Sequence, residues 1–219
     1  MTSEHFKVGI IGLGRISAAH IDTWKAIEGA SVVAACDSSE AARAAGAKQG
    51  LAMFSDPQAM LDSTALDAVT ICAPPHQHQP LAEICFDKGV PVLCEKPLAA
   101  DGTAATALVE SAHRHRARFQ LATKFRHVPE VQLARQLMAD GAVGDPLTFR
   151  IEFSGPVDMS QRWNSDPSVS GGGVLIDNGS HALDLARYLF SPIGQRDGRK
   201  LEAHSEASGG RLCADPCLD

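Results

Sequence analysis

A glycine-rich turn near the N-terminus is the part of this chain whose residue types and spacing point most directly to chemistry. In KVGIIGLGRISAAH an apolar run ends at Gly12, and Gly14 and Ser17 complete the three small-residue positions of a G-x-G-x-x-G/A turn. Gly12 permits a tight turn, Gly14 lets a pyrophosphate approach the backbone, and a small third residue lets the next helix pack near the strand. At Arg15 and Ile16 the helix start offers free N–H groups and a partial positive charge. The pattern predicts dinucleotide binding; an ordinary tight turn is the alternative.

A carboxylate at the end of the second apolar run could select the dinucleotide. Asp37 closes SVVAACD, twenty residues after Ser17. A carboxylate at this position can accept hydrogen bonds from the adenosine ribose hydroxyls. Because its charge would repel a 2′-phosphate, Asp37 favours NAD, whereas Ser38 and Arg43 leave NADP open.

Three further residues could act on a substrate. Lys96 ends a predicted strand at the carboxyl edge of a sheet, where it could donate a hydrogen bond to a substrate oxygen. A surface Lys paired with Glu95 explains the same residues equally well. Asp177 and His181 are four residues apart and share one helix face. A His there can take a hydroxyl proton as hydride leaves carbon, with Asp177 holding the ring; a polar stripe facing water is the alternative.

The elements that must position these residues alternate along the first 123 residues. Strands are predicted at 6–12, 31–37, 51–55, 66–74, 90–95 and 117–123, and helices at 15–28, 39–50, 57–61, 79–89 and 101–116. Strands that are apolar on both faces and separated by helices indicate a parallel sheet covered on both sides. We therefore predict an α/β fold with a doubly wound, Rossmann-type sheet.

The pattern changes after residue 124. A helix is predicted at 128–141, a strand with one wet face at 147–153, and a helix in the second half of 171–190. One such strand cannot complete a domain, because it needs partners. The predicted organisation is an NAD(P)-binding Rossmann domain at 1–123, the start of an incomplete α+β domain at 124–190 and an atypical, disordered tail at 191–219.

Composition excludes several classes of protein. The chain is 44% hydrophobic and 21% charged, as is usual for a soluble globular protein. Its formal net charge of -6 argues against a general nucleic-acid surface. No apolar stretch reaches the length of a membrane span, and the N-terminus does not resemble a signal peptide, so we expect a cytoplasmic protein.

The cysteines and isolated histidines predict no metal site. Cys36, Cys85 and Cys94 lie in apolar segments, where a free thiol behaves as a small hydrophobe. The pair Cys213 and Cys217 lacks a second pair of ligands. His20 on the first helix is interpreted as a packing or surface residue.

Three separated motifs resemble those of the Gfo/Idh/MocA (glucose–fructose oxidoreductase / inositol dehydrogenase) family. Beyond the glycine turn, residues 71–99 carry a strand that runs into a Pro-containing loop with a following His, and a strand that ends in Glu-Lys-Pro. A Gly-rich entry to a helix with Asp-x-x-x-His follows later. The matching positions are Ala73, Pro74, His78, Glu95, Lys96, Pro97, Asp177 and His181.

The resemblance implies an NAD(P)-dependent oxidoreductase that moves hydride between nicotinamide and a hydroxyl or carbonyl of a sugar, cyclitol or related polyol. It implies His181 as acid/base, Lys96 as the oxygen-polarising group and Asp177 as its orienting partner. Cofactor contacts are then expected from Cys72, Ala73, Pro74, His78, Glu95 and Lys96, and substrate contacts from Lys124, Arg126 and Trp163. Full-length relatives are expected to be homo-oligomers.

Two departures from the family pattern shape the alternatives. Pro75 stands where the family often has Asn, and the chain stops short of the open antiparallel sheet of the family's second domain. We therefore expect a C-terminally truncated chain, with a frame shift as the preferred account of the tail. A catalytically inactive nucleotide-binding protein is the alternative function. A methyltransferase that binds S-adenosylmethionine is a weaker interpretation, against which the later motifs argue.

Overall fold

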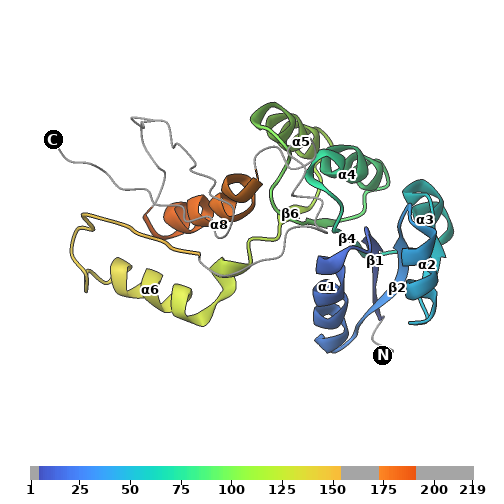
Figure 1. The fold of residues 1–219 in the computed structure, drawn as a ribbon, viewed down its shortest axis with the longest axis horizontal. Helices are drawn as coiled ribbons and strands as arrows, with labels where there is room; N and C mark the ends of the chain where they lie inside the picture. The colour runs from blue at the N-terminus through green and yellow to red at the C-terminus, as the bar shows by residue number, and fades with distance from the viewer. Residues whose placement is uncertain (1–4, 154–172, 191–219) are drawn as a thin grey trace, which may run out of the picture. The chain divides into compact units, whose positions relative to one another are not determined.

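The computed structural model describes residues 5–153 and 173–190 (Figure 1). These fall into two compact units. The first contains the described residues up to Ala122, and the second contains those from Thr123 onward. Within these ranges, none of the helices has the length and hydropathy needed to cross a membrane. The predicted tail at 191–219 lies outside the described residues.

The first unit is built on a six-stranded sheet with the order β3-β2-β1-β4-β5-β6. The strands are β1 (Phe6–Ile11), β2 (Ala30–Cys36), β3 (Ala52–Phe54), β4 (Ala68–Ile71), β5 (Val92–Cys94) and β6 (Phe119–Leu121). Every neighbouring pair is parallel, so the predicted doubly wound sheet is confirmed. The chain reverses its direction of travel across the sheet between β1 and β4, and ligands of such folds bind in the crevice at that point.

Helices cover both faces of this sheet. They are α1 (Arg15–Ala26), α2 (Glu40–Ala47), α3 (Pro57–Ser63), α4 (His78–Asp87) and α5 (Gly102–Arg114), with a 3₁₀ turn, η1 (Pro75–Gln77), before α4. Alternate residues of β1 enter two separate core clusters: Val8 and Ile10 pack with Ile21 of α1, and Ile11 packs with Phe86 of α4. Both faces of the strand are therefore buried, as the continuous apolar runs predict.

The helix starts in this unit differ in a way that matters for the site. Ser39, Asp56 and Asp101 each accept a hydrogen bond from a backbone N–H in the first turn of α2, α3 and α5. Such caps satisfy donors that have no partner within the helix. By contrast, the N-cap residue of α1 is Gly14, which has no side chain to cap the helix. The N–H groups of Arg15 and Ile16 therefore have no side-chain cap and can bind another acceptor.

The second unit contains a 3₁₀ turn, η2 (Lys124–His127), and the helices α6 (Pro129–Ala139) and α8 (Gly173–Phe190). The predicted strand at 147–153 is wrong: these residues adopt no regular secondary structure, and Leu147 is 97% exposed. Alternating hydrophobicity favours a strand only where a neighbour supplies a hydrogen-bonded ladder. Over the described part of this unit no strand pairs with it. The last helix begins at Gly173, earlier than predicted.

Candidate functional site

The local packing of the protein requires a glycine at position 12, independently of any ligand. Its φ is +91°, and its N–H donates to the Cys36 carbonyl over 2.8 Å. A Cβ here would lie 2.8 Å from the backbone nitrogen of Ala73 and 2.9 Å from the carbonyl carbon of Cys72. Because those atoms belong to backbone, they cannot swing aside as a side chain could. Gly12 therefore lets the turn after β1 and the loop after β4 pack against each other.

Gly14 faces open space. Its φ of −70° suits any residue, and a Cβ built there meets no heavy atom within 4 Å. The buried Ser17 hydroxyl donates to the Gly14 carbonyl over 2.6 Å and holds this corner from within the helix. Arg15 and Ile16, the first two residues of α1, are both exposed. The uncapped helix start therefore has room for a phosphate at the place where α1 presents its positive end.

Asp37 follows β2 and reaches across to the same turn. One carboxylate oxygen accepts the Leu13 N–H at 2.7 Å and the other accepts the Ser39 N–H at 2.8 Å. Each oxygen keeps a further acceptor site, so the carboxylate can still receive ribose hydroxyls. Arg43 donates to the backbone carbonyls of Asp37 and Ser38, both at 2.8 Å. Its guanidinium therefore braces the loop that carries the carboxylate.

His78 occupies the interior between two loops. Its ring is fully buried, with Nε2 2.8 Å from the Ala73 carbonyl oxygen and Nδ1 3.2 Å from the Leu98 carbonyl oxygen. Burial lowers the pKa of His78. Cys72 is also buried, whereas Ala73 and Pro74 are half-buried. A direct cofactor contact from His78 stays a prediction that this geometry does not support, since the ring offers no surface to a ligand.

The motif Glu95-Lys96-Pro97 follows β5 and contains a cis peptide bond between Lys96 and Pro97. One Glu95 oxygen lies 2.7 Å from Nε2 of His20, and the other accepts the Lys96 N–H at 3.0 Å. Burial alone would raise the pKa of Glu95, but the hydrogen bonds and charges of His20 and Lys96 together outweigh burial and lower it. His20 is therefore a member of this site that the sequence interpretation missed. The sequence feature that could have indicated this role is that His20 lies on the helix that follows the glycine turn.

In the second unit, Asp177 and His181 share one side of α8 as predicted from their spacing. His181 is 8% exposed, and its ring packs edge-on against Phe125, with ring centroids 4.8 Å apart. Phe153 lies 6.3 Å from the same ring. Two aromatic neighbours thus shield the imidazole from water while Asp177 lies one helical turn before it.

Arg126 is engaged in an ion pair with Asp184 of α8. Its Nε lies 2.9 Å and 2.8 Å from the two carboxylate oxygens, and its terminal nitrogen makes a further short contact with one of them. This carboxylate raises the pKa of Arg126. The guanidinium carbons of Arg126 and Arg135 lie 5.5 Å and 4.4 Å from the centroid of the Tyr188 ring. The predicted substrate contact of Arg126 would therefore compete with a formed ion pair.

The other predicted substrate residues are less constrained. Lys124 is exposed, and its Nζ lies 5.1 Å from the centroid of the Phe125 ring. Trp163 lies outside the described residues. Lys96 belongs to the first unit, and Asp177 and His181 belong to the second. Their meeting in one active site stays a prediction.

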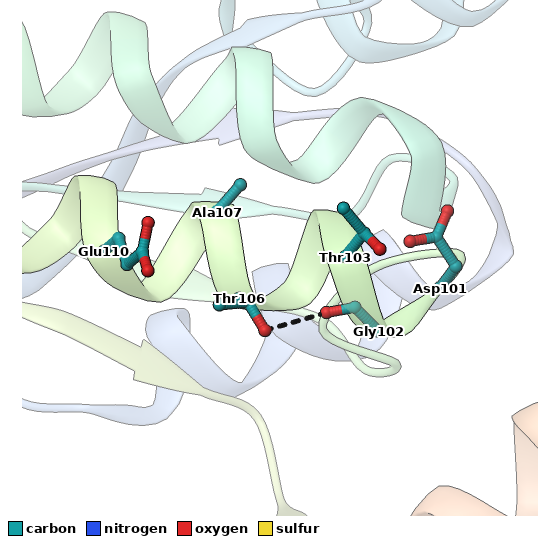
Figure 2. A pocket seen from close by; sticks show the side chains of 6 residues that line it. All are labelled: Asp101, Gly102, Thr103, Thr106, Ala107 and Glu110. Atoms are coloured by element: carbon teal, nitrogen blue, oxygen red, sulfur yellow. Dashed lines mark hydrogen bonds between the residues drawn. The ribbon is translucent and has the colours of Figure 1, made fainter.

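Surface hollows do not identify the site. One hollow, of about 720 Å³, lies along the first three turns of α5. Figure 2 shows its lining residues and the hydrogen bond from the Thr106 hydroxyl to the Gly102 carbonyl, which is 2.9 Å long. Another, of about 700 Å³, lies in the second unit beside Arg126, Arg135 and Tyr188. The first contains none of the predicted site residues. The candidate site therefore depends on the glycine turn, Asp37 and the Glu95-Lys96-Pro97 loop.

Two family models and several known proteins match this chain. Residues 6–123 match the family model described as "Oxidoreductase family, NAD-binding Rossmann fold", and residues 131–206 match that of the "GFO/IDH/MocA C-terminal domain". A D-apiose dehydrogenase of Paraburkholderia graminis is 32% identical over 212 residues, which are 95% of this chain and 56% of the relative. An inositol 2-dehydrogenase of Saccharopolyspora erythraea is 31% identical over 187 residues, 84% of this chain and 53% of that protein.

A solved structure also matches the fold of this chain. The apo scyllo-inositol dehydrogenase of Lactobacillus casei superposes with a TM-score of 0.73 at 27% identity, covering 86% of this chain and 56% of that structure. The chain thus spans about half the length of the curated relatives it matches.

Proposed function

Because this chain belongs to the Gfo/Idh/MocA oxidoreductase family, with its NAD-binding Rossmann fold, we propose that it is an NAD-dependent dehydrogenase of sugars, cyclitols or related polyols. The reaction transfers hydride between nicotinamide and a hydroxyl or carbonyl carbon. The substrate class is supported by the names of similar proteins, which act on apiose and inositol.

The observation that carries this proposal is the contrast between the two turn glycines. Gly12 is needed for packing, whereas no neighbouring atom around position 14 requires a glycine there. A side chain there would project into the space in front of the uncapped start of α1. A bound pyrophosphate explains why that space is kept, because it takes hydrogen bonds from the free N–H groups.

The charges around Asp37 support NAD rather than NADP as the preferred cofactor. The carboxylate is anchored by two backbone N–H groups, so it stays beside the turn. A 2′-phosphate would lie close to its negative charge. The Arg43 guanidinium, which could have neutralised that phosphate, already donates to two loop carbonyls.

The chemical roles follow from the side chains. A nicotinamide dinucleotide, when bound, accepts or returns the hydride. Lys96 donates a hydrogen bond to the reacting substrate oxygen and stabilises its developing negative charge. His181 takes the hydroxyl proton during oxidation and returns it during reduction. Asp177, one turn earlier on α8, orients the imidazole.

The proposal is tested by following nicotinamide absorbance across a panel of sugars and cyclitols. We expect turnover with at least one of them, and saturable NAD binding without any turnover would instead support the inactive nucleotide-binding protein. His181→Ala should lower turnover by about two to four orders of magnitude while the Kd for NAD changes less than about twofold. The control His127→Ala, on an exposed residue of η2, should change neither. Equal loss of binding and turnover in His181→Ala would contradict the acid/base role.

A further inference from the structure

A histidine and a carboxylate from distant parts of the chain form a largely buried pair beside Lys96. Nε2 of His20 lies 2.7 Å from Oε1 of Glu95, and the two side chains are only 15% and 14% exposed. The second Glu95 oxygen accepts the backbone N–H of Lys96 at 3.0 Å. The Glu95 carboxylate therefore links the His20 side chain of α1 to the backbone of Lys96.

A second histidine holds the other end of the same short loop. His78, at the start of α4, places Nδ1 3.2 Å from the carbonyl oxygen of Leu98. The four residues from Glu95 to Leu98 are thus held on one side by α1 and on the other by α4. Both elements also border the proposed phosphate turn, because Gly14 is the N-cap residue of α1 and His78 of α4 reaches the Ala73 carbonyl at 2.8 Å.

We propose that His20 is a positioning residue that acts through Glu95 to fix the backbone of Lys96 relative to the phosphate turn. This inference rests on the proposed function, in which Lys96 polarises the substrate oxygen. His20 lies six residues after Gly14 on the same helix, about 9 Å along its axis. The helix that receives the phosphates is therefore joined to the Lys96 loop by one short hydrogen bond.

The His20–Glu95 hydrogen bond can control the position of the Lys96 backbone because the Glu95 carboxylate is largely buried. A carboxylate that is mostly shielded from water needs its partners, since an unpaired buried charge is unfavourable. Without His20, we expect the Glu95 carboxylate to turn toward solvent and to release the Lys96 N–H. A displacement of about 1 Å at a catalytic group can lower turnover by about a hundredfold.

Hydrogen exchange tests the structural half of the proposal without any turnover. In NMR-detected exchange on the whole chain, His20→Ala should speed exchange of the Lys96 amide by about ten- to hundredfold, the value of a hydrogen bond to a charged group. His20→Gln keeps an N–H donor and should restore most of the protection. The matched control is His115→Ala, because His115 also pairs with a carboxylate of the same unit, Asp87 at 3.1 Å. This control should leave the Lys96 amide unchanged.

Kinetics test the catalytic half. We expect His20→Ala to lower kcat by at least about tenfold with the Kd for NAD within about twofold of wild type, and His20→Gln to recover most of the loss. Unchanged exchange at Lys96 in His20→Ala would overturn the inference, as would an equal kcat loss in His115→Ala. If the wild-type chain turned over no polyol, the proposed function would fail, while the exchange result would still decide whether His20 holds Lys96.

Discussion

Gly12→Ala and Gly14→Ala separate the two reasons for which a phosphate turn contains glycine. At Gly12 an alanine meets two penalties. The φ of +91° disfavours any Cβ by about 1–2 kcal/mol, and crowding a well-packed interior costs about 1–3 kcal/mol more. The Cβ would lie 2.8 Å from backbone of the loop after β4, so relief requires that loop to move. We expect Gly12→Ala to lower the free energy of unfolding by about 2–5 kcal/mol, a large share of the usual 5–15 kcal/mol.

At Gly14 the same change should leave the fold nearly untouched. The backbone conformation suits alanine, and no heavy atom lies within 4 Å of the new Cβ. Loss of glycine at an N-cap costs at most about 1 kcal/mol. The methyl group would occupy the proposed pyrophosphate position, so affinity for NAD should fall at least about tenfold, or about 1.4 kcal/mol.

Urea unfolding and NADH fluorescence titration of both variants provide the measurement. The reasoning predicts a loss of stability in Gly12→Ala and a loss of affinity without loss of stability in Gly14→Ala. If Gly14→Ala bound NADH as tightly as wild type, no phosphate would lie against this backbone, and the proposed site would be refuted. A Gly12→Ala variant as stable as wild type would show that the two loops do not pack as described.

Three other changes test separate parts of the molecule. Asp37→Ala removes the charge that opposes a 2′-phosphate, so the ratio of the Kd values for NADP and NAD should fall at least about tenfold in parallel titrations. Burial raises the pKa of the Cys85 thiol from 9.0 to about 12, so the folded state keeps this proton after the unfolded state has lost it. The free energy of unfolding should therefore decline as the pH rises from about 9 toward 12, and in urea titrations Cys85→Ala should show a shallower decline. Asp184→Ala leaves the Arg126 guanidinium without its carboxylate and should lower stability by about 1–3 kcal/mol in thermal unfolding. The exposed control Glu152→Ala should change stability by less than about 1 kcal/mol.

The Rossmann unit and its nucleotide turn follow from local sequence. Continuous apolar runs predict strands buried on both faces, and all six of those predicted form the parallel sheet. The turn is equally local: Gly12, Gly14 and Ser17 lie between one strand and one helix, and Asp37 follows the next strand. Hydrophobic periodicity and glycine conformation act over a few residues, so a single sequence contains this information.

The prediction of a strand at 147–153 was wrong because strand formation does not depend on local sequence alone. Its alternation describes one amphipathic face, but a strand also needs backbone hydrogen bonds from a neighbour. The sequence of the segment does not show whether such a neighbouring strand is present.

Tertiary structure alone decided which side chains meet. His20 and Glu95 are 75 positions apart, and Arg126 and Asp184 are 58 apart. The fold turned His20 from an expected packing or surface residue into the partner of Glu95, and it buried the ring of His78 between two loops. Such pairs depend on how helices and loops pack across the sheet, which no local pattern of residues specifies. Sequence therefore predicted a dinucleotide site at the glycine turn, and packing determined how the loop that carries Lys96 is held.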